Sequence, residues 1–192
     1  GGSGAMASLT IGGDVFEIEG SGFGPVGEAK SVRVLYQQSS YTASRTDRPA
    51  LPVFEAIDCR VLTDNSMTCK TGVGVGYNFT YKVEIEGQLS DTANNAVRST
   101  KALKREPSHN GGAYARPTVN TVTKRDMDPL YDADTRGGEL VVIRGTNFGP
   151  IATWNIVTAT FGLPSLSPGS SVQQFTAQSC NVTESHTEIT CY

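Results

Sequence analysis

The clearest pattern along the chain is an alternation of large apolar and polar residues between positions 77 and 86. The apolar positions of this run are Tyr77, Phe79, Tyr81, Val83 and Ile85, and the residues between them are polar or charged. A period of two predicts a β-strand with one buried and one solvated face. Shorter alternating runs recur elsewhere, and they place the following residues on inward faces: Phe16, Ile18, Val32, Val34, Tyr36, Ile57, Cys59, Val61, Val141 and Ile143. The pattern predicts an all-β fold.

The chain also contains an internal repeat. The segment Gly12-Gly-Asp-Val-Phe-Glu-Ile-Glu-Gly-Ser-Gly-Phe-Gly-Pro25 aligns without a gap with the segment from Gly137 to Pro150, and the offset is 125 positions (137 − 12). The same offset places Val157, Ala159 and Phe161 on the alternating apolar positions 32, 34 and 36. Short-period solenoids repeat every 20 to 50 residues or so, which is far less. The repeat therefore predicts two copies of one domain.

Each copy ends its first alternating run in a glycine-rich corner. The corner residues are Gly20, Phe23, Gly24 and Pro25 in the first copy and Gly145, Phe148, Gly149 and Pro150 in the second. Glycine adopts positive φ and proline ends ladder pairing, so the motif predicts a tight turn, with the phenylalanine closing one end of a sandwich. Phosphate-binding loops need a following helix, and no helical pattern follows here. We interpret the corner as structural.

These residues resemble the IPT/TIG family, which comprises immunoglobulin-like domains of plexins, related receptors and some transcription factors. The resemblance rests on the motif GG-x(6)-G-[ST]-[GN]-F-G-P, on the alternating run after it and on a cysteine-containing hairpin in each copy. It covers most of residues 9–91 and 116–192. It implies two immunoglobulin-like (E-set) β-sandwiches in tandem.

The domain boundaries follow from the repeat. We expect an expression scar at residues 1–8, a first domain at 9–102, a linker at 103–115 and a second domain at 116–192. The first copy has no counterpart of the strand expected at 118–123, and the second has no counterpart of the strand at 77–85. Both copies therefore look truncated, and we expect the second to be loosened or to pair with another segment or chain.

The four cysteines fall into two pairs, one in each copy. An even count that matches the repeat predicts the disulfides Cys59–Cys69 and Cys180–Cys191, because each pair lies on the two strands of a hairpin. Two disulfides imply an oxidising compartment, and hence an extracellular or cell-surface location. Reduced thiols in a cytosolic protein are the alternative.

Net charge and hydropathy narrow the range of partners. The chain carries a net charge of −3, so no overall positive field attracts nucleic acid or anionic membrane. No apolar run approaches the roughly 20 residues that span a bilayer, and we expect no membrane insertion. The basic stretch between Arg98 and Arg125 is interpreted as a solvated linker; contact with an anionic polysaccharide and proteolytic processing after Arg105 remain alternatives.

Two features point to modification or ligand binding. The triplets beginning at Asn78 and Asn181 are N-glycosylation sequons, and both asparagines are predicted to be exposed on polar strand faces. Four acidic residues could supply oxygen ligands to calcium, although a solvated loop is the simpler interpretation. They are Asp126, Asp128, Asp132 and Asp134.

The sequence contains no recognisable set of nucleophile, base and orienting group. His109 lies in the expected linker and His186 in a hairpin turn, so we expect neither catalysis nor a cofactor. The resemblance implies a structural or adhesive segment of a multi-repeat surface protein. Its partners would be neighbouring repeats and proteins or glycans met by loops 37–53 and 163–171. The alternatives are a ligand-binding segment of a plexin-like receptor and a sugar-binding module presenting Trp154.

Overall fold

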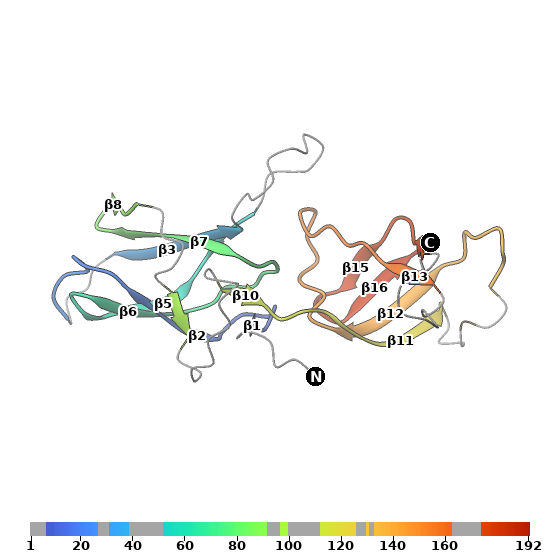
Figure 1. Ribbon diagram of the computed structural model, residues 1–192, viewed down its shortest axis with the longest axis horizontal. Coiled ribbons are helices and arrows are strands. Elements are labelled where there is room, and N and C mark those ends of the chain that lie inside the picture. The colour runs from blue at the N-terminus through green and yellow to red at the C-terminus, as the bar shows by residue number, and fades with distance from the viewer. Residues whose placement is uncertain are drawn as a thin grey trace, which may run out of the picture. The chain divides into compact units, whose positions relative to one another are not determined.

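The computed structural model describes residues 7–26, 31–38, 52–91, 97–99, 112–125, 130, 133–162 and 174–192 (Figure 1). Strands, and no helix, occur within these ranges, which confirms the all-β prediction. The chain divides into two compact units, residues 1–116 (unit 1) and residues 117–192 (unit 2).

Unit 1 consists mainly of two four-stranded antiparallel sheets that face each other (Figure 1). The first sheet has the order β5–β6–β2–β9, with bounds Ile57–Thr63, Ser66–Lys70, Val15–Glu19 and Val97–Ser99. The second has the order β4–β3–β7–β8, with bounds Val53–Glu55, Val32–Gln38, Phe79–Ile85 and Gln88–Leu89. This is a sandwich-like arrangement.

Aromatic rings join the two sheets of unit 1. The ring of Phe16 on β2 lies 6.5 Å from that of Tyr36 on β3 and 5.9 Å from that of Tyr81 on β7. Ile18 and Val34, which alternate with polar residues as predicted, are buried in the same core. Large aromatic side chains remove much apolar surface from water, so this cluster supplies a large share of the stability of unit 1.

The strong alternating run starts later than the sequence indicates. Strand β7 begins at Phe79, and Tyr77, which was predicted to point inward, is 56% exposed. Between them Asn78 has a φ of 55°, a left-handed conformation that interrupts the extended backbone. The period of two therefore cannot be extended back through Asn78.

The central strand of the repeat has two neighbours in both units. In unit 1 the central strand β2 pairs antiparallel with β6 on one side. On the other side it pairs antiparallel with β9, which comes much later in the chain. In unit 2 the corresponding edge is occupied by β11, which precedes the repeat motif. In unit 1 this edge is therefore filled by β9, which comes later in the chain, and not by a described strand that precedes the motif.

The segment before unit 2 is part of unit 1. Strand β10 (Ala113–Tyr114) pairs in parallel with β1 (Ala7–Ser8), and Tyr114 is buried. Residues 112–115, expected in a linker, and residues 7 and 8, expected to lie outside the fold, therefore belong to the folded part of unit 1. Residues 103–111 lie outside the described part of the chain.

Tyr114 is held by a closed set of hydrogen bonds. Its hydroxyl donates to the Gly72 carbonyl at 2.7 Å, so the 2.6 Å contact with Tyr36 is a bond that the Tyr36 hydroxyl donates. The Gly72 amide in turn donates to the Tyr36 hydroxyl at 3.0 Å. Burial is the main cause that raises the pKa of both tyrosines, so both stay neutral donors.

Tyr114→Phe tests this network. The substitution leaves the partly buried Gly72 carbonyl without its donor and the Tyr36 hydroxyl without its acceptor, so we expect a loss of about 1–3 kcal/mol in the free energy of unfolding of unit 1. Urea unfolding measures it. Tyr192→Phe, at an exposed tyrosine, is the control and should change the stability by less than about 0.5 kcal/mol. Equal effects of the two substitutions would contradict the network.

Unit 2 repeats the first sheet of unit 1. Its order is β11–β12–β16–β15, with bounds Thr118–Lys124, Val141–Thr146, Glu188–Cys191 and Asn181–Glu184. Phe148, Val182, Ile189 and Cys191 form its buried core, and Ile143, Val157 and Ala159 pack against them as predicted. The strand predicted at 118–123 is confirmed.

The second sheet of unit 2 is smaller than that of unit 1. Its described part has two antiparallel strands, β13 (Thr160–Gly162) and β14 (Gln174–Thr176). Phe161, which corresponds to the buried Tyr36, was predicted to point into a core and is instead 61% exposed. Its ring stacks on Phe175 of β14 with centroids 5.4 Å apart. Phe161 therefore lies outside the buried core of unit 2.

Candidate functional sites

The two glycine-rich corners have the same geometry. Gly22 and Gly24 in unit 1, and Asn147 and Gly149 in unit 2, all have φ between 60° and 86°. These conformations reverse the chain tightly at the end of β2 and of β12. The reversal returns Phe23 and Phe148 over the preceding strand, where both rings are buried.

The first glycine of each corner makes room for the phenylalanine ring. A Cβ atom at Gly20 would lie 2.6 Å from Cζ of Phe23, and one at Gly145 would lie 2.6 Å from Cζ of Phe148. At Gly145 it would also overlap the carbonyl oxygen of Thr118 on β11. The corners are therefore packing motifs, and the backbone amides of the first glycine and of the phenylalanine in each corner are hydrogen-bonded.

Those amides bind the tip of the cysteine hairpin in each unit. In unit 1 the Gly20 amide donates to the Asn65 carbonyl at 2.9 Å, and the Phe23 amide donates to the Asp64 carbonyl at 3.0 Å. In unit 2 the amides of Gly145 and Phe148 donate to the carbonyls of Thr187 and His186 at 2.9 and 3.1 Å. The motif and the hairpin thus form one structural element, present twice.

Both predicted disulfides are present. The sulfur atoms of Cys59 and Cys69 are 2.08 Å apart, and those of Cys180 and Cys191 are 2.05 Å apart. Each bridge joins the two arms of the hairpin whose tip the corner holds. All four cysteines of the sequence are bonded within their own unit.

The two sequons differ in accessibility. Asn181 is exposed on the edge strand β15, and its side-chain amide donates to the Ser179 carbonyl at 3.1 Å. Asn78 is half-buried, and its backbone amide donates to the Gly112 carbonyl at 2.9 Å. It precedes β7 and does not lie on the polar face of that strand. The prediction of an exposed side chain holds for Asn181 and is wrong for Asn78.

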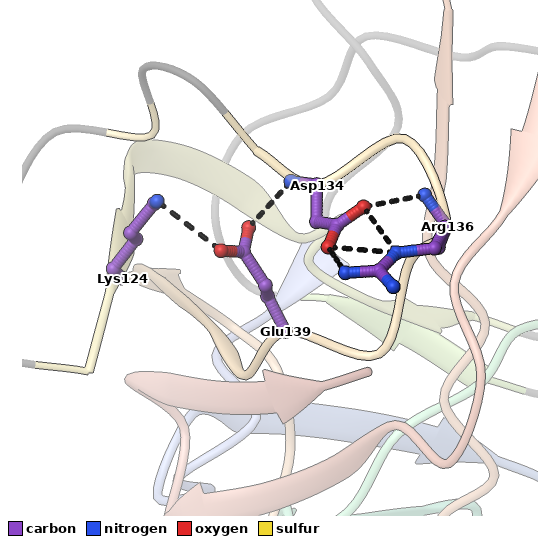
Figure 2. A network of polar contacts seen from close by, with 4 residues as sticks. All are labelled: Lys124, Asp134, Arg136 and Glu139. Atoms are coloured by element: carbon purple, nitrogen blue, oxygen red, sulfur yellow. Dashed lines mark hydrogen bonds and ion pairs between the residues drawn. The ribbon is translucent and has the colours of Figure 1, made fainter.

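Asp134 is the one calcium candidate within the described residues, and it is engaged by a cation of the chain itself (Figure 2). The Arg136 guanidinium donates to both carboxylate oxygens, at 2.7 Å in the shortest contact, and the Arg136 amide donates to Oδ1 at 2.9 Å. The hydrogen bond from the Arg136 side chain is the main cause that lowers the pKa of Asp134.

A second carboxylate holds the backbone of this loop. Glu139 accepts hydrogen bonds from the Asp134 amide at 3.2 Å and from Nζ of Lys124 at 3.3 Å (Figure 2). Asp126, Asp128 and Asp132 lie outside the described residues. Within the described ranges no three His, Cys, Asp or Glu side chains gather in a way that could hold a metal ion. A calcium ion at Asp134 would have to displace Arg136.

His186 connects the stability of unit 2 to pH. It occupies the hairpin tip with φ 69°, and burial lowers its pKa from the ordinary 6.5. The unfolded chain therefore binds a proton more readily. The stabilising contribution is complete above pH 6.5 and is lost as the pH falls from that value through the lower pKa of the folded state. We expect the melting temperature of unit 2 to fall between pH 7 and pH 5.5 by more in the wild type than in His186→Asn.

Asparagine is the matched replacement because it tolerates positive φ without titrating in this range. Carboxylates titrate alike in both proteins, so the difference between the two pH profiles isolates the histidine. Parallel profiles for the two proteins would contradict the assignment.

The remaining predicted binding features are only partly described. Most of loop 37–53 and all of loop 163–171 fall outside the described residues, as does His109. Trp154 is half-buried rather than displayed. No helix among the described residues has the length and apolar character needed to cross a bilayer.

Sequence reasoning missed two features of these sites. Tyr114 stands alone between Gly112 and Pro117 in a polar stretch, where alternation gives no signal. The hydrogen bonds between each corner and its hairpin join residues about 40 positions apart. A weak signal existed for the second: a turn lies between the cysteines of both copies, so the corner and the hairpin tip recur together.

Comparison of the chain with protein-family models, with curated proteins and with solved structures gives no match.

Proposed function

We propose that the chain is a non-catalytic, extracellular segment of a multi-repeat surface protein, built of two IPT/TIG-like immunoglobulin-like domains. The observation that supports it best is the recurrence in both units of a glycine corner hydrogen-bonded to a disulfide-bonded hairpin. Such a rigid, repeated scaffold suits a spacer that presents loops to proteins or glycans.

The disulfides support the extracellular part of the proposal. Disulfides persist in oxidising environments and are rare in the cytosol, and here they use every cysteine. Each closes a short loop and contributes roughly 3 kcal/mol by the chain-entropy estimate, which is substantial for domains of this size.

The described charged side chains support a structural rather than a catalytic role. Arg33 bridges Glu55 and Glu84 across three neighbouring strands, at 3.0 and 3.3 Å. Lys70 pairs with Asp58 at 2.7 Å across the cysteine hairpin. Exposed pairs of this kind connect strands and keep opposite charges paired on the surface, each with a small effect on stability.

Glycan attachment is the sharpest test of the compartment. When the protein is secreted from eukaryotic cells, we expect mass spectrometry to find a glycan on Asn181 and much lower occupancy at Asn78. Thr183→Ser keeps the sequon and should keep the glycan, whereas Thr183→Ala should lose it. Retention inside the cell with four titratable thiols would overturn the proposed location.

The adhesive role needs its own experiment. Beads coated with the secreted protein should attach to cultured cells or matrix more strongly than beads coated with albumin, and soluble protein should compete for the attachment. Attachment no stronger than that of albumin beads would overturn adhesion while leaving the location intact.

A further inference from the structure

The two units differ at one edge of a strand that the repeat allows us to compare directly, which is β3 in unit 1 and β13 in unit 2. Residue Thr160 of β13 corresponds to Leu35 of β3, and Phe161 corresponds to Tyr36. In unit 1, β3 pairs with β4 on one side and with β7 on the other. In unit 2, β13 pairs with β14 on the first side, and no described strand pairs with it on the second.

The hydrogen bonding between β13 and β14 shows which backbone groups of β13 face the second edge. The Ala177 amide donates to the Ala159 carbonyl at 3.0 Å, just as the Ala56 amide donates to the Val34 carbonyl at 2.9 Å in unit 1. Backbone groups alternate between the two sides of a strand. The amides and carbonyls of Thr160 and Gly162 therefore point away from β14, toward the second edge.

The same edge exposes apolar surface. Tyr36 is 2% exposed because the rings of Phe79 and Tyr81 on β7 cover it, with centroids 5.4 and 5.5 Å away. Phe161 has its β14 neighbour, Phe175, yet remains 61% exposed. Its exposed ring and the outward backbone groups of Thr160 lie on one strand, which is the combination that strand addition uses.

We propose that the second edge of β13 binds an extended peptide segment as an antiparallel strand, with large apolar residues at alternate positions and polar residues between them. The chemistry is that of β7, whose Phe79, Tyr81 and Val83 are buried while Lys82 between them is exposed. The proposal concerns unit 2 alone and does not depend on an adhesive role.

A second copy of the chain fits this edge less well. The β7 strand of another molecule is already bonded to β3 on one side and β8 on the other. Edge-to-edge pairing of two β13 strands would supply no large apolar residues at alternate positions, because Phe161 is the one large apolar residue of that strand. A separate segment with its own large apolar residues could hydrogen-bond to the outward backbone groups of β13 and also cover the ring of Phe161.

The test uses the whole chain and a synthetic peptide with the sequence of residues 78–87. We expect saturable binding, measured by calorimetry, and at least about tenfold slower hydrogen exchange at the Thr160 and Gly162 amides. Thr160→Pro removes an edge-facing amide without removing a bond to β14, so binding should weaken at least tenfold. Thr160→Val keeps the amide and should bind as the wild type does.

A second peptide separates strand addition from simple apolar contact. In unit 1 Leu35 is paired with Lys82 and Gln37 with Thr80, so N-methylation at the positions of Thr80 and Lys82 blocks the bonds while keeping the side chains. This peptide should not bind. Unchanged exchange protection in β12 and β16 of Thr160→Pro confirms that unit 2 remains folded.

Three results would overturn the proposal. The first is no binding of the unmodified peptide to the wild type. The second is equal binding by Thr160→Pro or by the methylated peptide, which would show a stacking surface such as a glycan could use. The third is a wild-type dimer, seen by sedimentation and abolished by Thr160→Pro, which would assign the edge to a second copy.

Discussion

Gly145→Ala is expected to destabilise unit 2 by more than about 3 kcal/mol. The added Cβ atom would overlap the Thr118 carbonyl, which belongs to the backbone of the neighbouring strand β11, and would press on the ring of Phe148. The backbone of β11 is hydrogen-bonded to β12 and cannot move away without losing hydrogen bonds, so this steric clash cannot be relieved by a small shift. Thermal unfolding followed by near-ultraviolet circular dichroism, or by amide exchange in β12, measures the loss.

Two other alanine substitutions separate the causes. Gly20→Ala meets only the far end of the Phe23 ring, which can shift, so we expect a smaller loss of about 1–2 kcal/mol in unit 1. Gly138 has a φ of +86°, and an added Cβ atom there would meet open space. Gly138→Ala should therefore lower the free energy of unfolding by about 1 kcal/mol through backbone conformation alone. If all three substitutions cost the same, close packing at Gly145 is not what makes glycine necessary there.

Removing the second disulfide is expected to be almost as damaging. The double variant Cys180→Ala, Cys191→Ala frees a loop whose ends are 11 positions apart, which costs roughly 3 kcal/mol by the chain-entropy estimate. Cys191 is also fully buried in a small core, so its sulfur leaves a cavity. We expect the melting temperature of unit 2 to fall by at least about 12 °C.

The matching variant in unit 1 is the control. Cys59→Ala, Cys69→Ala opens a loop of 10 positions, but the aromatic cluster of unit 1 lies between its two sheets and should keep that unit folded at 25 °C. Amide exchange in β2 and β12 reports the two units separately. If unit 1 unfolds without its disulfide while unit 2 stays folded without its own, unit 1 is the one that depends more on its disulfide, which contradicts this prediction.

Local chemistry determined what the sequence could predict. The corner phenylalanines, the two disulfides and the inward positions of Phe16, Val34 and Tyr36 follow from glycine conformation, hairpin geometry and a period of two. Each of these depends on residues that are close in sequence or that recur in both copies. They were predicted correctly because the physics that specifies them is local.

Features that depend on distant partners could not be predicted in this way. Tyr36 is buried beside β7, whereas no described strand pairs with β13 on the corresponding edge and Phe161 is exposed, although the two positions align in the repeat. Tyr114 is buried because β10 pairs with β1, more than 100 positions earlier in the chain. The left-handed backbone of Asn78 stops an alternation that would otherwise include Tyr77.

The measurement that tests the account most directly is disulfide mapping of the natively produced protein. The account predicts that a non-reduced digest contains two linked peptide pairs, Cys59 with Cys69 and Cys180 with Cys191, and no alkylated cysteine. A bridge that joins the two units would contradict two units that each carry their own disulfide. Free thiols at any of the four positions would contradict the proposed extracellular location.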